Sequence, residues 1–75
     1  MLHDPGQQLE ALVTTAVSAL LVLPDEERAP LLTEMRTVVF RRAAEMYGLP
    51  VGMRFAEKFV NAVARRIDSQ DSADA

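Results

Sequence analysis

The sequence predicts an all-α fold, an antiparallel three-helix bundle that dimerises into a larger helical bundle. Apolar residues recur at three- and four-residue steps over three separate segments, as they do on the buried faces of amphipathic helices. Proline and glycine interrupt this pattern at two places, which indicates helices joined by short corners. No pair of segments has the alternating pattern of strands. The 75 residues are enough for one small domain, which we expect over residues 1–68.

The first helix is predicted over residues 5–23. Asp4 is a suitable N-cap, Pro5 has its φ preset for the first helical position, and Gln7 can reach back in a capping box. Pro24 ends the helix because the residue before a proline is disfavoured in the helical region. The apolar positions of this helix are Leu9, Leu12, Val13, Ala16, Val17, Leu20 and Leu21.

The second helix is predicted over residues 30–47, after a short turn at residues 25–29. Pro30 lacks a backbone N–H and therefore suits the first position of a helix better than its interior. Gly48 is a natural C-terminal residue in the left-handed conformation, and Pro50 prevents continuation. The apolar positions are Leu31, Leu32, Met35, Val38, Val39, Ala43 and Met46, with Phe40 and Tyr47 at one margin.

The third helix is predicted over residues 51–68, with Met53 and Phe55 at its start. Residues 69–75 are polar and acidic and lack periodicity, so we expect a disordered tail there. The buried stripe of the third helix is expected to contain Ala56, Phe59, Val60, Val63, Ala64 and Ile67.

The composition argues against enzymatic and metal chemistry. The chain has no cysteine, and its one histidine, His3, stands near the N-terminus, where no base can be held beside a nucleophile. Glu26 and Glu27 are adjacent and point in different directions on a helical turn, so they make a poor acid–base pair. We therefore expect no catalytic, cofactor-binding or metal-ligating residues.

The N-terminal residues lack the basic region and cleavage site of a secretory signal. The longest apolar run, residues 19–23, is far shorter than the ~20 residues of a membrane span. The most apolar helix, residues 5–23, has no Lys or Arg to contact anionic lipid. These features predict a soluble, cytoplasmic protein without a membrane partner.

The apolar residues of the first two helices exceed what a three-helix core can cover. At 100° per residue the apolar arc of residues 5–23 spans roughly 200°, compared with about 100° for the usual stripe of a surface helix. A domain of this size also has a thin stability margin and has no disulfide or metal to add to it. We therefore expect a homodimer. The expected self-association residues are Leu9, Leu12, Val13, Val17, Leu20, Leu21, Val39, Phe40 and Tyr47.

Charge is distributed unevenly along the chain. Residues 31–67 contain seven basic and three acidic residues, a net charge of +4, whereas the remainder has a net charge of −7. Arg54, Lys58, Asn61 and Arg65 follow one another at steps of four, three and four, which places them on one face of the third helix. This face is the candidate site for an anionic partner.

The segment AAEMYGLP resembles the end of the first helix and the turn of helix-turn-helix modules, through Ala43, Ala44, Tyr47, Gly48 and Leu49. This resemblance implies that the third helix is a DNA-recognition helix. Two departures weaken it. The inward-facing positions six and nine residues after the glycine should be apolar but are Arg54 and Glu57, and Gly-Leu-Pro-Val-Gly makes a longer corner than the tight turn of such modules.

The best interpretation is a small non-enzymatic helical module for protein interaction or regulation. Its expected partners are a second copy of itself and another protein. Two alternatives stay open: a DNA-binding transcriptional regulator that uses the third helix, and an accessory subunit of a larger enzyme complex. Nucleic acid is the less favoured partner because an overall pI near 4.9 opposes phosphate binding.

Overall fold

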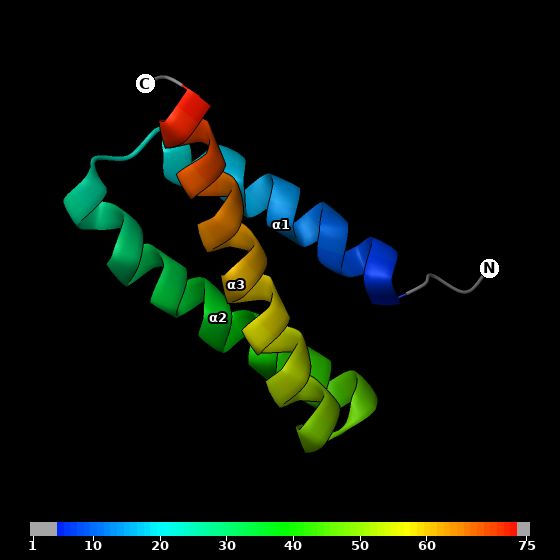
Figure 1. Ribbon diagram of the computed structural model, residues 1–75. Coiled ribbons are helices and arrows are strands. Elements are labelled where there is room, and N and C mark those ends of the chain that lie inside the picture. Colours follow the sequence, from blue (N-terminus) through cyan, green and yellow to red (C-terminus); the bar gives the residue numbers. More distant parts are fainter. Residues whose placement is uncertain (1–4, 74–75) are drawn as a thin grey trace.

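Three helices account for nearly all of residues 5–73, the part of the chain that the computed structural model describes (Figure 1). They are α1 (Pro5–Leu21), α2 (Asp25–Tyr47) and α3 (Leu49–Ala73). The described residues contain no strand, so the all-α prediction is confirmed. Helix α1 begins at Pro5 as predicted, while the predicted cap Asp4 and His3 lie outside the described residues.

Helices α2 and α3 form a hairpin, and α1 packs mainly on α3 (Figure 1). The end of α1, the start of α2 and the end of α3 lie at one end of the molecule, and the α2–α3 corner lies at the other. The molecule measures 40 × 25 × 17 Å along its principal axes. Because a helix with its side chains is about 10–12 Å across, the thinnest dimension is less than two helix diameters.

Helix α2 begins at Asp25, so the predicted turn at residues 25–29 is wrong and Pro30 lies inside the helix. Pro30 removes the helical hydrogen bond to the carbonyl of Glu26. Three acidic residues in the first turn favour helix formation through the helix dipole. A tertiary contact from Arg28 adds to this effect and outweighs the local cost of the proline.

Arg28 joins the start of α2 to the end of α1. Its Nε donates to the carbonyl oxygens of Leu20 at 3.0 Å and Leu23 at 3.2 Å, and its Nη2 lies 3.5 Å from that of Leu21. Its Nη1 pairs with Asp25 Oδ1 at 2.9 Å. The guanidinium thus supplies a donor to carbonyls at the end of α1, where the Leu20 carbonyl also accepts from the N–H of Leu23 at 3.1 Å. Helix α1 ends at Leu21, two residues before the predicted end.

The corner between α2 and α3 is a single residue, Gly48, so the longer corner predicted from Gly-Leu-Pro-Val-Gly is wrong. Gly48 has φ 95° and ψ 163°, a combination that is essentially restricted to glycine. Its N–H donates to the carbonyl of Ala44, and its own carbonyl accepts from the N–H of Gly52, each at 2.9 Å. The glycine predicted as a helix stop therefore ends α2 and also starts α3.

Gly52 allows α3 to lie directly against α2. A Cβ atom at Gly52 would stand 2.9 Å from the N, Cα and Cβ atoms of Ala44, closer than such atoms pack. The backbones of the two helices therefore meet here without an intervening side chain. Gly52 is buried although it is only four residues from the exposed corner.

The core lies where α1 meets the hairpin. Phe59, Val63, Leu20 and Val13 have the largest fully buried side chains. The predicted stripe of the third helix is confirmed at Ala56, Phe59 and Val63, but Ala64 is exposed. The other buried apolar residues are Ala16, Val17, Val39 and Ala43.

Helix α3 continues to Ala73, five residues beyond its predicted end. The predicted disordered tail, residues 69–75, is therefore helical over residues 69–73, and residues 74–75 lie outside the described part. Ser69 and Gln70 are exposed and polar on this last section of helix. Residues 69–75 lack an apolar stripe, and for this reason we predicted disorder there. A helix can nevertheless continue beyond the residues that pack against its neighbours.

Substituting Gly52 with alanine is expected to destabilise the fold by about 1–3 kcal/mol, because the added Cβ forces the α2 and α3 backbones apart. Urea denaturation followed by circular dichroism measures the change. The control is Asn61→Ala at an exposed position of α3, where the helix propensity of alanine should leave stability unchanged or raise it by up to about 1 kcal/mol. Equal effects of the two substitutions would contradict the close packing at Gly52.

Arg28→Met is expected to cost about 1–3 kcal/mol of unfolding free energy, because the carbonyls at the end of α1 lose a charged donor while the apolar stem is kept. Arg41→Met, at an exposed position of α2, is the control and is expected to change stability by less than about 0.5 kcal/mol. Thermal and urea unfolding of both variants test the prediction. A loss no greater for Arg28 than for Arg41 would contradict it.

Candidate interaction surfaces

An apolar groove of about 360 Å³ runs between α1 and α2. These two helices contact each other less than either contacts α3. Phe59 of α3 and Val39 of α2 line the groove, and Leu12 and Val38, which are 43% and 66% exposed, also line it. Among the described residues, Glu34 is the only charged one along it. The groove is thus an apolar surface left open to solvent by the separation of two helices. Its remaining lining residues are Thr15, Ala16, Ala19, Leu31 and Met35.

The structure disperses the residues predicted for self-association. Four of them are in the core of the single chain, out of reach of a second copy in this conformation: Val13, Val17, Leu20 and Val39. Leu9 and Leu21 pack against the core from its edge, and Phe40 is half-buried beside a separate depression next to Met53. Tyr47 is exposed at the corner. Leu12 is the one exposed member that lies in the groove.

The prediction omitted the groove residues on α2. Leu31, Met35 and Val38 follow one another at steps of four and three and line one side of the groove. We assigned them to the buried stripe of the second helix because they share its apolar arc. Val38 and Val39 are adjacent in sequence, but 100° of rotation places Val39 in the core and leaves Val38 in solvent. The width of the apolar arc on the second helix already indicated that some of its apolar residues had to lie outside the core.

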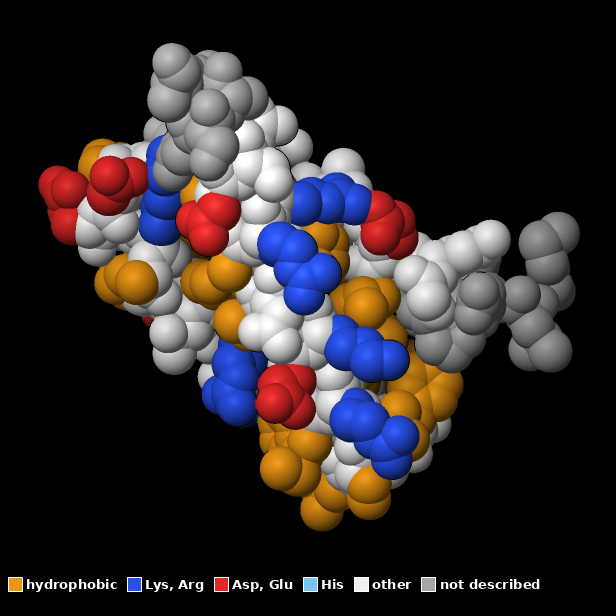
Figure 2. All heavy atoms as spheres, in the orientation of Figure 1, with side chains coloured by type: hydrophobic (Ala, Val, Ile, Leu, Met, Phe, Trp, Pro, Cys, Tyr) orange, Lys and Arg blue, Asp and Glu red, His pale blue; other side chains and the backbone are white. Residues whose placement is uncertain are grey.

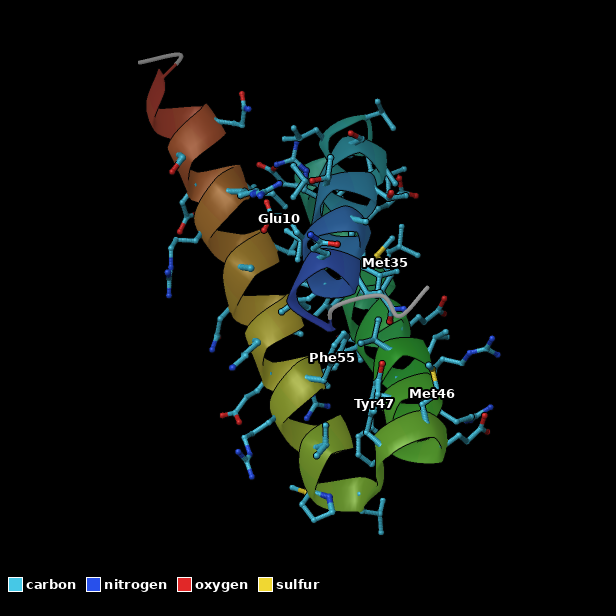
Figure 3. All side chains as sticks on the ribbon, turned by 90° about the vertical axis from the view of Figure 1, so that its right-hand side faces the viewer. Glu10, Met35, Met46, Tyr47 and Phe55 are labelled. Atoms are coloured by element: carbon cyan, nitrogen blue, oxygen red, sulfur yellow. The ribbon has the colours of Figure 1, made fainter. Side chains whose placement is uncertain are left out.

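A second group of exposed apolar side chains surrounds Gly48. We refer to it as the hairpin tip, and it consists of Met46, Tyr47, Leu49, Val51 and Met53. Figure 2 shows hydrophobic side chains gathered at the lower end of the molecule, and Figure 3 places Met46 and Tyr47 there on α2. Met53, predicted at the start of the buried stripe, is 63% exposed, whereas Phe55 packs against the core.

The predicted anionic-partner face is exposed on α3. Arg54, Lys58, Asn61 and Arg65 all lie in solvent, and Figure 2 shows basic side chains along this helix. Arg66 is engaged instead with α1: it pairs with Glu10, labelled in Figure 3, and its Nη1 donates to Thr14 Oγ1 at 2.8 Å. The residues of the predicted face therefore take no part in the contact of Arg66 with α1.

The described residues offer no obvious site for metal chemistry. Within residues 5–73, no three His, Cys, Asp or Glu side chains are grouped so that they could hold a metal ion. Over the same part of the chain, no helix combines the length and apolar character that crossing a membrane requires.

The α2–α3 corner differs from the turn of a helix-turn-helix module. Such a turn has three to four residues, whereas Gly48 alone separates α2 from α3. The two helices then lie against each other as a hairpin. Comparison with models of known families, with characterised proteins and with solved structures finds no match to the chain.

We expect α3 not to bind duplex DNA, because the hairpin geometry does not present it as a recognition helix. Electrophoretic mobility shift at low ionic strength with mixed genomic DNA checks this expectation. Binding that weakens with salt and with Arg54→Ala or Lys58→Ala would instead support the regulator alternative. Glu57→Ala, on the same helix, is the control for a general effect of truncation.

Proposed function

We propose that this chain is a non-enzymatic helical interaction module that self-associates through the groove between α1 and α2, forming a larger helical bundle. The observation that carries the proposal is the groove itself, whose walls are apolar and whose lining includes the exposed Leu12 and Val38. Burying Leu12 and Val38 against a partner would be favourable because it removes their apolar surface from water. The proposed regulatory role is that the paired state is the one that binds further partners.

The charges of the groove favour a second copy as the occupant. In a twofold dimer the same patch meets itself, so charged groups on the patch would face like charges. The groove limits this conflict to one pair of carboxylates, because Glu34 is the only charged residue among its described lining residues. Val38 lies on α2 beside the groove and can insert into the groove of a second copy, with the reciprocal contact following from symmetry. Each copy would thereby remove the exposed Leu12 and Val38 from water.

Val38→Glu is expected to weaken dimerisation at least about tenfold, because a carboxylate would have to be buried in an apolar contact on both copies. Sedimentation equilibrium over a range of micromolar concentrations measures the dissociation constant. The control is Val22→Glu, which adds the same charge at an apolar position that is 82% exposed and lies outside the groove. We expect Val22→Glu to dimerise like the unmodified chain.

A monomer at every concentration, or equal weakening by the two substitutions, would contradict self-association through the groove. The groove would then be a candidate site for a helix of another protein, which is the accessory-subunit alternative. Affinity capture from the native source, repeated with Val38→Glu, would test that alternative directly.

A further inference from the structure

We propose that the hairpin tip is a peripheral binding site for an anionic lipid surface. This site is separate from the groove, and the proposal does not depend on self-association. The sequence-based expectation of no membrane partner considered only the helix at residues 5–23, which lacks basic residues. The tip is formed instead by the corner of α2 and α3, where apolar and basic side chains occur together.

The shape of the tip suits a lipid interface. Its five large apolar side chains surround a one-residue corner at the end of the hairpin, and Val51 and Met53 also line depressions beside it. Leu49 and Met53 are each 63% exposed, and Tyr47 adds an aromatic ring of the kind that is enriched at membrane interfaces. A protein partner would need a matching hollow, whereas a lipid headgroup layer opens around a protruding apolar group.

Basic residues stand at the depth that headgroups would occupy. Arg42 is five residues before Tyr47 and Arg54 is five residues after Leu49, so each lies about 8 Å along its helix from the corner. Apolar groups of peripheral helices enter about 5–10 Å into the boundary between headgroups and acyl chains. Both arginines are exposed, as are Arg41 and Lys58 further from the corner. Figure 2 shows basic side chains next to the apolar lower end.

The charge distribution orients the molecule with its tip toward an anionic surface. Residues 36–58, the tip half of the hairpin, contain five basic and two acidic residues, a net charge of +3. Residues 25–35 and 59–70, the far half, contain three basic and five acidic residues, a net charge of −2. The same positive charge disfavours a second copy at the tip, because twofold pairing would bring the arginines of both copies together.

One acidic residue opposes the proposed binding. Glu45 is exposed and lies two residues before Tyr47, within about 3 Å of the corner along α2. At an anionic surface its carboxylate would be repelled and partly desolvated. Glu45→Gln is therefore expected to tighten binding, an outcome that a purely structural role of this residue would not produce.

Co-sedimentation of the full chain with lipid vesicles tests the proposal. We expect binding to vesicles of phosphatidylcholine with phosphatidylserine, and at least about fivefold weaker binding to phosphatidylcholine alone, since each basic residue near an anionic surface contributes about fivefold. Binding should weaken as salt is raised. Leu49→Ser with Met53→Ser should reduce binding at least about tenfold through the loss of inserted apolar groups.

Matched controls use the far end of the molecule. Val22→Ser removes an exposed apolar side chain, and Glu27→Gln neutralises an exposed carboxylate as Glu45→Gln does at the tip; both should bind vesicles like the unmodified chain. Arg54→Gln should weaken binding about fivefold. Circular dichroism checks that each variant is folded, and repeating the measurement with Val38→Glu separates loss of self-association from loss of the tip.

Absence of binding to phosphatidylserine vesicles at low ionic strength would overturn the proposal. Equal binding by the tip variants and the far-end variants would also overturn it. In either case the remaining interpretation of the tip is a docking site for a protein with acidic groups around an apolar hollow.

Discussion

The rest of the structure depends on the close packing of α2 and α3 at Ala44 and Gly52. With one residue in the corner and no side chain between the backbones, the hairpin is closed tightly at that end. Space for large side chains therefore exists only further along, where Phe59 and Val63 of α3 meet Leu20 of α1. Helix α1 packs mainly on α3 as a result, and its separation from α2 leaves the groove. The apolar residues at the corner have no third helix to cover them.

Much of this fold was predictable because its causes are local. Apolar spacing identified the three helices, and Pro5 and Gly48 marked a start and a stop through their own backbone preferences. The errors arose where a distant residue decides the outcome. Pro30 indicated a helix start, but Arg28 stabilises an earlier start through the carbonyls of α1. Gly52 was predicted only as part of the start of the third helix, whereas its role is to let the α3 backbone lie against the backbone of α2.

The sequence indicated that apolar side chains would remain exposed, but it did not indicate which residues these would be. Apolar arcs wider than a small bundle can cover indicated that some side chains had to remain exposed. Periodicity alone does not show which edge of an arc faces inward, since that depends on how three helices are rotated against one another. Val38 and Val39 illustrate this limit, as do Leu12 and Val13: each pair is adjacent, and in each pair one residue is buried and the other is exposed. The exposure of the basic residues on α3 was easier to predict, because charged side chains remain in solvent however the helices are packed.

The two surfaces differ in a way that separates their roles. Among the described residues the groove has a single charged one along it, so a second copy would bring only one pair of like charges together there. The tip half of the hairpin is positive, so the same arrangement there is electrostatically unfavourable and an anionic partner is favoured. Covering the groove also removes the exposed Leu12 and Val38 from water, which links self-association to the stability of the chain. Covering the tip adds no such support, since its side chains lie beyond the core. A partner can therefore bind to the tip and dissociate from it without a change in the packing of the helices.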